Sequence, residues 1–585
     1  MDHKAIAQSL GAGWGDDLAR VVGSLPSADS AAVRAWLSDG EGGVDPRALL
    51  GTHARVGSEL APPSSDDPQA VRRIGVIGGG TAGYLTALAL KAKRPWLEVS
   101  LVESPDIPII GVGESTVTFL LMFLHHYLGI DADELYRRVR PTWKTGINFE
   151  WGPHPDGFRC AFDWSADSIG LLGAIEQTGN ISGSTMGSVL LTKDKAAVFE
   201  VDGKPVSLMK YLPFAYHLDN KPFVRFLTDL AQQRGVRHVP ATLSEVVTAG
   251  DGWVDHLRTT DGRELRFDMY VDCTGFRSML LEKALGTPFV SFGDSLFTDS
   301  AITGNVDHGG HIKPYTEVIT MDAGWNWGIP TPDADHRGYV YSSAFISDDQ
   351  AAEEFKRRYP GISEPHKLRF RSGRHEKAWV GNVMAVGNSY AFTEPLESSG
   401  LVMAAEAIWS FVSVLPTSWA QPPAGRELLN SALNQRWDQV RWLIAAHYKF
   451  NTRLDTPFWR EARANTDLSG FQPLVDMFED VAPLSRRDGL IQDMLNRVSP
   501  TTFALYGMDN IWLGMQKPTR RRLPMDEPVE RWQARYDAAQ ALAAKALPVR
   551  EALAAYAEYP ELNRQLLEDD DSWAGRRVAA MMGML

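Results

Sequence analysis

The sequence predicts an α/β protein in which a Rossmann-like nucleotide-binding fold is followed by a mixed β-sheet region and a C-terminal helical subdomain. Residues 73–90 contain an apolar run, a glycine turn and an alanine- and leucine-rich stretch, the pattern of a strand that leads into a helix. Strand-like runs fill residues 298–343, and helical periodicity dominates from residue 405 onward. We therefore expect a core over residues 73–404 and a helical subdomain that covers a pocket over residues 405–585.

Residues 1–72 precede this core, and we expect them to form an N-terminal helical extension and a linker. Short helices are predicted over residues 6–25, 31–37 and 47–50, and APPSSDDP at 61–68 has the composition of a linker. The extension either carries no chemistry or helps to hold a large substrate or a second subunit.

Length and composition exclude several classes of protein. The 585 residues are enough for two or more domains, and a net charge of -14 without a basic tract argues against a nucleic-acid partner. No signal peptide and no run of about 18 apolar residues is present, so we expect no membrane insertion. Cys160 and Cys273 are the two cysteines, too few for a disulfide framework or a cysteine-rich metal site, and we expect a reducing cytoplasm and no metal.

The glycine turn has the spacing of a dinucleotide-binding motif. Gly78, Gly80 and Gly83 match G-x-G-x-x-G, which serves a tight turn, close approach of backbone to a pyrophosphate, and packing of helix on strand. The helix that follows presents unpaired N–H groups to anionic phosphates. After a second predicted strand comes Glu103, whose carboxylate can accept hydrogen bonds from a ribose diol.

The rest of the core contains further candidate elements. Lys144, beside Trp143, precedes a strand-like alternation, which is compatible with an amine that points into a walled site. Its position alone favours a surface lysine whose stem lies along apolar surface. GWNWGIP at 324–330 interrupts the second run of strands, and a second glycine turn at Gly387 is followed by a helix that starts near Ser399. Other expected elements are a helix opened by Glu114 and Ser115, a loop-like stretch over 151–209, a helix over 217–236, strands over 238–247, 253–259 and 265–271, and helices over 427–448, 458–464 and 528–557.

Taken together, the motifs GGGTAG, GVGEST, TWKTGI, WNWGIP and EPLESSGL, in this order, resemble the flavin-dependent tryptophan halogenases. The resemblance covers about residues 73–463, and the family's W-x-W-x-I-P box is matched by Trp325, Trp327, Ile329 and Pro330. Single-component flavin monooxygenases share the first glycine triplet but generally lack the box and the lysine.

The resemblance implies an enzyme that uses FAD, reduced by a separate flavin reductase, with O2 and chloride or bromide to form hypohalous acid. Lys144 then either hydrogen-bonds the oxidant as an ammonium or forms a haloamine, and Ser398 helps to align substrate and lysine. Glu397 polarises the oxidant or accepts the proton of the halogenated ring, unless it only caps a helix. The halide is expected at Ser399 and Gly400. The implied FAD contacts are Gly78, Gly80, Thr81, Ala82, Gly83, Glu103, Ser104, Glu114, Ser115, Gly387, Asn388 and Leu401.

The tryptophan box has a physical role under this resemblance. Trp325 and Trp327, with Ile329 and Pro330, would form a wall of the flavin site and tunnel that keeps an organic substrate from the flavin. Simple packing of these rings in the core is the alternative, and both can hold together.

The substrate segment departs from the free-tryptophan members of the family. Tyr448, Phe458 and Trp459 match aromatic residues that flank an indole, but His447 and Leu454 stand where those members tend to have a tyrosine and a glutamate. Leucine leaves a substrate ammonium without a partner, so we expect a tryptophan within a peptide or a larger indole product. With residues 1–72, this resembles family members that halogenate a lanthipeptide in antibiotic biosynthesis. The alternatives are a free-tryptophan halogenase, a flavin-dependent aromatic hydroxylase and a non-catalytic peptide-binding flavoprotein; a homo-oligomer is also open.

Overall fold

The structure is a computed structural model of the chain. It describes residues 20, 21, 24, 62–107, 113–163, 181–250, 252–363, 366–420, 423–484, 504–520, 529–567, 572 and 573. The predicted N-terminal helices lie almost wholly outside the described residues, as do Gly111 and Val112 at the start of the GVGEST motif.

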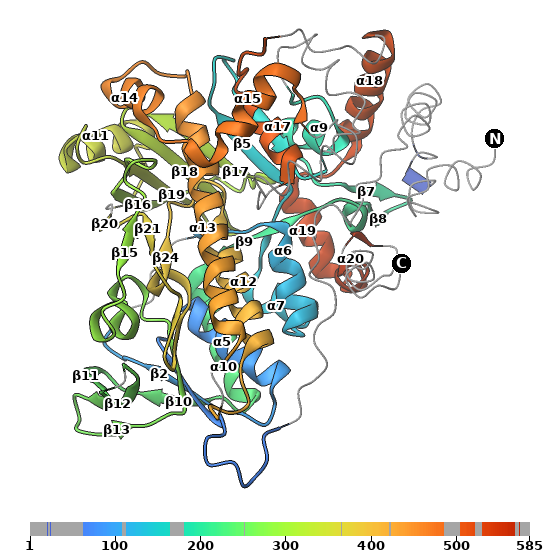
Figure 1. The fold of residues 1–585 in the computed structure, drawn as a ribbon. Coiled ribbons are helices and arrows are strands. Elements are labelled where there is room, and N and C mark those ends of the chain that lie inside the picture. The colour runs from blue at the N-terminus through green and yellow to red at the C-terminus, as the bar shows by residue number, and fades with distance from the viewer. Residues whose placement is uncertain are drawn as a thin grey trace.

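A six-stranded sheet forms the lower part of the molecule in Figure 1. Its spatial order is β10 (Arg237–Pro240), β2 (Glu98–Glu103), β1 (Arg73–Ile77), β14 (Met269–Asp272), β23 (Val383–Ala385) and β22 (Trp379–Val380). The first five strands run parallel, and β22 is antiparallel at the edge. Parallel strands are covered on both faces, which is why all four residues of β14 are buried. The predicted Rossmann-like sheet is confirmed.

Helices cover one face of this sheet and a small sheet covers the other. Helix α5 (Thr81–Lys93) packs against β1 and β2, and α10 (Asn220–Gln233) and α12 (Ser399–Val414) pack against α5. On the other face, Ile77 and Tyr270 meet Leu257 of β12 (Val254–Thr259), which pairs with β11 (Leu243–Thr248) and β13 (Glu264–Leu265).

The glycine turn between β1 and α5 is shaped by close backbone approach. Gly78 has φ of +121°, and a Cβ there would lie 2.2 Å from the Cys273 carbonyl oxygen. A Cβ on Gly83 would lie 1.9 Å from the Gly78 oxygen. Gly80 is the N-cap residue of α5, and nothing lies within 4 Å of a Cβ built on it. The turn is therefore tight against the sheet and open on the side of the helix N-terminus.

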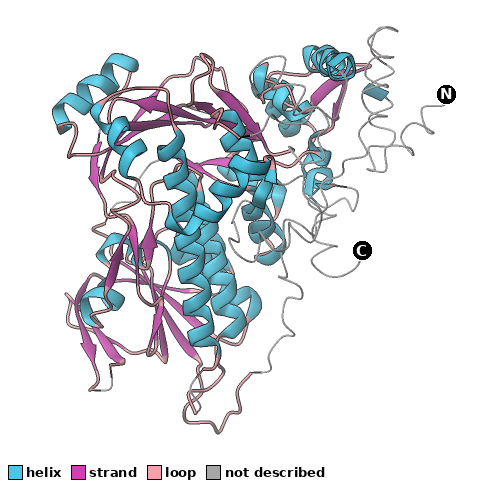
Figure 2. Ribbon diagram, turned by 45° about the horizontal axis from the view of Figure 1, so that its top comes forward, coloured by secondary structure: helices cyan, strands magenta, loops and turns pink. Residues whose placement is uncertain are grey.

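A seven-stranded mixed sheet forms the upper part of the molecule (Figures 1 and 2). Its order is β20 (His366–Arg369), β16 (Ser300–Val306), β19 (Asp335–Tyr341), β18 (Gly324–Pro330), β17 (Tyr315–Met321), β5 (Gly146–Glu150) and β6 (Phe158–Ala161). Neighbours are antiparallel except β17 and β5. The GWNWGIP segment is β18 itself, so the predicted interruption was wrong. Trp325, Trp327 and Ile329 occupy every second position of a continuous, buried strand and therefore lie on the same face of it.

A further three-stranded sheet lies against the upper sheet. Its order is β3 (Gly113–Ser115), β9 (Ala215–Asp219) and β4 (Thr142–Lys144); β3 packs near β18, and β4 near β17. Glu114 and Ser115 lie in β3, so the expectation that they open a helix was wrong, and α6 (Thr118–Leu121) begins three residues later.

Several short helices and strands differ from those predicted. The stretch predicted as loop-like over 151–209 contains β6, α9 (Met186–Thr192), β7 (Val198–Val201) and β8 (Lys204–Ser207), all too short for a clear periodic signal. The predicted helix over 217–236 starts only at Asn220, because the side chain of Asp219 caps it after β9. The predicted helix over 528–557 is two helices, α18 (Val529–Lys545) and α19 (Val549–Glu558), since Pro548 lies between them.

Two long helices run beside both large sheets. Helix α12 contacts α13 (Gly425–Phe450), and α13 continues past β22 toward α14 (Pro457–Asn465) at the upper sheet (Figure 1). Helices α15 (Gln472–Val481), α17 (Ala504–Gly514) and α20 (Glu561–Leu567) lie in the C-terminal part with α18 and α19. Among the described residues, no helix combines the length and the apolar character that crossing a membrane requires.

We predict that Gly83→Ala destabilises the protein while Gly80→Ala does not. The added methyl at position 83 overlaps a backbone oxygen that cannot move without shifting β1, so we expect a loss of about 2 kcal/mol or more in the free energy of unfolding. At position 80 the methyl enters open space, and the loss should stay below about 1 kcal/mol. Urea denaturation measures both variants; equal stabilities would contradict this account of the turn.

Candidate active site

Lys144 is the last residue of β4, and its side chain is completely removed from solvent. Its Nζ donates a hydrogen bond of 2.8 Å to Oγ of Ser398 and lies 5.5 Å from the ring centroid of Phe162. The expectation of a surface lysine was therefore wrong. Burial lowers the pKa of Lys144 from 10.5 to about 7, against the opposing attraction of Glu397. Near neutral pH both the amine and the ammonium are populated.

The segment before α12 brings a carboxylate and a hydroxyl to this amine. Ser398 is the N-cap residue of α12 and has φ of +56°, a left-handed conformation that is rare outside glycine. The carboxylate of Glu397 points to α13, where its Oε1 lies 2.6 Å from Nε2 of His447. The alternative that Glu397 acts only as a helix cap does not account for this contact.

The contact between Glu397 and His447 is a close approach of two buried polar groups. Nδ1 of His447 lies 2.8 Å from the carbonyl oxygen of Leu443, which can only accept, so Nδ1 carries a hydrogen. Nε2 of His447 lies 2.6 Å from Oε1 of Glu397, but the two atoms do not have the geometry of a hydrogen bond. The imidazole is therefore a close polar neighbour that α13 brings to this carboxylate.

The start of α12 also has the features of an anion site. Ser399 and Gly400 are its first two residues, where backbone N–H groups have no partner within the helix. Oγ of Ser399 is buried without a hydrogen-bond partner, and a Cβ on Gly400 would meet nothing within 4 Å. An unpartnered hydroxyl beside open space at a helix N-terminus fits a small anion.

A second buried carboxylate, Glu394, ties the tryptophan box to the substrate segment. Its Oε1 accepts a 3.0 Å hydrogen bond from Nε1 of Trp325 and a 2.5 Å hydrogen bond from the hydroxyl of Tyr448, and Thr298 donates to the other oxygen. Burial raises the pKa of Glu394. Trp325 and Trp327 pack with ring centroids 6.1 Å apart, so the core-packing interpretation of the box is confirmed; its role as a wall stays a prediction.

The predicted substrate aromatics form one buried cluster. The rings of Tyr448 and Trp459 stack with centroids 5.5 Å apart, and Phe458 lies 5.0 Å from Trp459 with its edge toward it. Nε1 of Trp459 donates to the Met321 carbonyl oxygen at 2.8 Å. The structure thus brings these three aromatics to Glu394 and the box. Leu454, in the turn after α13, instead lines a separate pocket.

The first and second glycine turns meet at the carboxyl end of the lower sheet. A Cβ on Gly387, whose φ is +67°, would lie 3.2 Å from Cβ of Ala82 in the first turn of α5. Asn388 follows in a short 3-10 turn. Glu103 ends β2, where its Oε2 lies 2.8 Å from the hydroxyl of Tyr84 and 2.9 Å from Nε2 of His238.

These residues fit a dinucleotide such as FAD. Gly80 opens to free space at the start of α5, and the partly buried Glu103 stands at the end of the neighbouring strand, as a pyrophosphate and a ribose require. Other predicted contacts have protein partners: Thr81 donates to Asn220, Ser104 bonds Thr242, and Ser115 bonds Thr316 and Ser398. Burial raises the pKa of Glu114 to about 7, and Leu401 is buried in α12.

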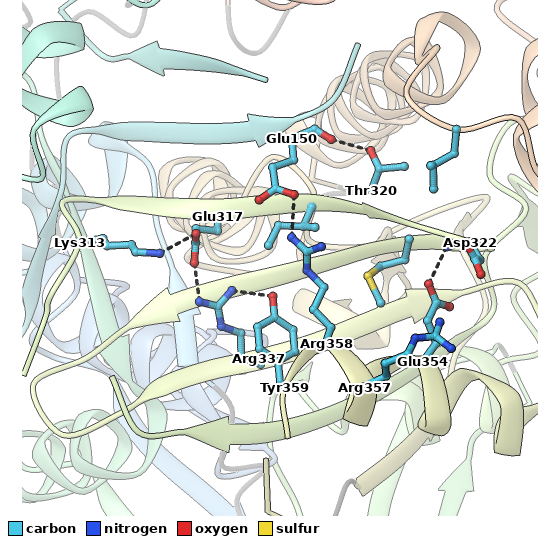
Figure 3. Close-up of a pocket in the computed structure, with 13 residues that line it drawn as sticks. Glu150, Lys313, Glu317, Thr320, Asp322, Arg337, Glu354, Arg357, Arg358 and Tyr359 are labelled. Carbon is cyan, nitrogen blue, oxygen red and sulfur yellow. Dashed lines mark hydrogen bonds and ion pairs between the residues drawn. The ribbon is translucent and has the colours of Figure 1, made fainter. Parts of the chain in front are cut away.

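A cavity that Lys144 does not line is drawn in Figure 3. It has a volume of about 650 Å³ and opens on the face of the upper sheet that carries α11 (Asp348–Arg358), opposite the tryptophan box. Glu317 pairs with both Lys313 and Arg337, and Arg358 pairs with Glu150 (Figure 3). These charges neutralise one another, and Lys144 is not among the residues that line this cavity.

Sequence reasoning missed three participants in the site. Glu394 precedes Glu397 by three residues in EPLES, and the two acids in one short motif were the available signal. His447 stood out only as a departure from a tyrosine. His217 gave no signal, because it fell within the predicted helix over 217–236; it lies instead in β9, fully buried, with Nε2 2.9 Å from Oγ1 of Thr316.

Comparison with known proteins gives a consistent result. The family model described as tryptophan halogenase matches residues 73–526. The lanthipeptide tryptophan 5-halogenase MibH has a crystal structure that is 59% identical in sequence and superposes with a TM-score of 0.86, covering 88% of this chain and 99% of MibH. Tryptophan 7-halogenase RebH of Lentzea aerocolonigenes is 34% identical over 434 residues, 70% of this chain and 82% of RebH. Tryptophan 6-halogenase SttH of Streptomyces toxytricini is 28% identical with a TM-score of 0.74, covering 83% of this chain and all of SttH.

We predict that Lys144→Met stabilises the fold while removing the reactive amine. A thioether does not lose hydration on burial as an ammonium does, so the free energy of unfolding at pH 7 should rise by about 1–3 kcal/mol. Lys517→Met is the matched control, because Lys517 is also buried but pairs with Glu479 at 2.6 Å. That variant should be destabilised. Thermal or urea unfolding checks both signs, and a Lys144→Met protein less stable than the wild type would contradict the cost assigned to the buried amine.

Proposed function

The chain belongs to the tryptophan halogenase family, and from this we propose that it is a FADH2-dependent halogenase that chlorinates or brominates the indole of a tryptophan within a peptide. The observation that carries the proposal is the amine of Lys144, fully buried and held by Ser398 near the carboxylate of Glu397. An isolated buried amine is costly, and such groups cluster at reactive sites.

When bound, reduced FAD, supplied by a separate flavin reductase, provides with O2 and halide the hypohalous acid that the site uses. Gly78, Gly80, Thr81, Ala82 and Gly83 would hold its pyrophosphate at the start of α5, and Glu103 its ribose. Gly387 and Asn388 would add contacts from the second turn. Ser399 and Gly400 would bind the halide.

The residues of this chain would then guide the oxidant to the ring. Lys144 holds the oxidant through its nitrogen, and Ser398 fixes the direction of that nitrogen. Glu397 accepts the proton released from the halogenated carbon, and the imidazole of His447 lies 2.6 Å from that carboxylate.

A peptide substrate is supported by the side chains at positions 447 and 454, which offer no partner for the carboxylate or ammonium of a free amino acid. His447 is engaged with Glu397, and Leu454 carries no charge, so neither can bind the carboxylate or ammonium of a free amino acid. A tryptophan inside a peptide presents neither group at its α-carbon. The similarity to MibH, described as a halogenase of a lanthipeptide tryptophan, points to the same class of substrate.

We predict that the protein, given FAD, a flavin reductase, NADH and bromide, brominates tryptophan-containing peptides at least about tenfold faster than free tryptophan. Mass spectrometry of the products from both substrates measures the ratio. Lys144→Ala should reduce product by about a hundredfold or more, because the oxidant loses its anchor near the ring. Lys517→Ala serves as the control for loss of a buried lysine away from the site.

Each of the other possible results of this experiment would indicate a different activity. Faster halogenation of free tryptophan would replace the peptide with the amino acid as substrate. Oxygen from labelled O2 in the product without halide would identify an aromatic hydroxylase. Peptide binding without turnover would identify a non-catalytic flavoprotein, and equal activity of Lys144→Ala would refute the role given to Lys144.

A further inference from the structure

A continuous row of hydrogen bonds connects Lys144 to a buried histidine that the family motifs do not include. Lys144 Nζ lies 2.8 Å from Oγ of Ser398, which lies 2.9 Å from Oγ of Ser115. Ser115 is 2.6 Å from Oγ1 of Thr316, and Thr316 is 2.9 Å from Nε2 of His217. Beyond the imidazole, Nδ1 is 3.3 Å from Oγ1 of Thr142. The row joins β4, α12, β3, β17 and β9.

The direction of every hydrogen bond in this row follows from its last member. Oγ1 of Thr142 lies 2.6 Å from the carbonyl oxygen of Pro330, and because a carbonyl only accepts, Thr142 must donate to it. Its proton is then in use, so Nδ1 of His217 is the donor toward Thr142. A neutral His217 therefore has a bare Nε2, which accepts from Thr316.

The directions of the remaining hydrogen bonds, from Thr316 back to Lys144, are fixed in turn. The hydroxyl of Thr316 donates its hydrogen bond to His217, so Ser115 must donate to Thr316. Ser398 in turn donates to Ser115, and Lys144 donates to Ser398. As long as His217 is neutral, Ser398 can accept from Lys144 but cannot donate to it.

The surroundings keep His217 neutral. It is completely buried, and burial together with the charge of Lys144 holds its pKa well below the ordinary value. The other titratable groups nearby are on the side of Lys144: Glu397 before α12, with His447 of α13 and the buried thiol of Cys160 on β6 close to it. Glu114 is the neighbour of Ser115 in β3, and alternation along the strand turns its side chain to the opposite face.

We propose that His217 is a positioning residue: as a neutral acceptor at the end of the row, it fixes Ser398 as an acceptor and so stabilises the ammonium form of Lys144 relative to the amine. A hydrogen bond from an ammonium is about twice as strong as one from a neutral donor. A hydroxyl free to turn would instead donate to the lone pair of the amine and favour that form. His217 thus sets the fraction of Lys144 that is protonated near neutral pH. Only the consequence for catalysis rests on the proposed function.

The test is an NMR titration of Lys144 in the protein without flavin or substrate, with lysine labelled at the ε position and the signal assigned by its loss in Lys144→Met. His217→Leu removes the acceptor, and we expect the midpoint of the titration to fall by about one pH unit. Thr316→Val cuts the row at a different strand and should give the same shift, which keeps the test open if His217→Leu does not fold. His217→Gln, whose amide oxygen can accept from Thr316, should restore the wild-type midpoint.

A matched control is His256→Leu, which removes a buried histidine of β12 outside the row and should leave the midpoint unchanged. An unchanged or raised midpoint in both His217→Leu and Thr316→Val would overturn the proposal, as would a shift in His217→Gln as large as in His217→Leu. The pH dependence of wild-type and variant bromination should move by the same amount. Because the titration needs no turnover, a wild type without halogenase activity would refute the proposed function and leave this result standing.

Discussion

The removal of the Lys144 amine from water is the constraint on which the rest of the site depends. Transfer of an ammonium to an apolar interior is strongly unfavourable unless polar partners surround it. Here the partners are one hydroxyl at 2.8 Å and a carboxylate that acts from further away. Both belong to the turn before α12, so the position of that helix between the two large sheets decides whether the amine can be buried at all.

Two histidines are linked to this amine through different groups. His217 ends a row of hydroxyls whose protons all point away from Lys144. His447 lies 2.6 Å from Glu397, whose charge attracts the Lys144 ammonium. The first arrangement leads to the nitrogen and the second to the nearby carboxylate, so the two reactive groups are contacted from different parts of the fold, β9 and α13.

Local features could be predicted from the residues themselves, and long-range ones only through the family resemblance. The turn at Gly78, Gly80 and Gly83 was predictable because its spacing belongs to one strand–helix unit, although Gly78 also approaches the Cys273 carbonyl oxygen. The burial of Lys144 did not follow from its position in the sequence, since it depends on Ser398, 254 positions away in the chain. Likewise β18 has the composition of an interruption, because two glycines and a proline in seven residues look like a turn until β17 and β19 are seen on either side.

The surroundings of the substrate segment differ from what its sequence alone indicates. From the sequence, Leu454 indicates only that an acidic partner is missing. The structure places Leu454 at the pocket on the α11 face, and it commits the His447 imidazole to Glu397. Around Tyr448, Phe458 and Trp459 the contacts are therefore aromatic, and Glu394 is already used by three donors. Under the proposed function such a site would recognise an indole but not the backbone that carries it, so discrimination between peptides would come from surfaces beyond the ring.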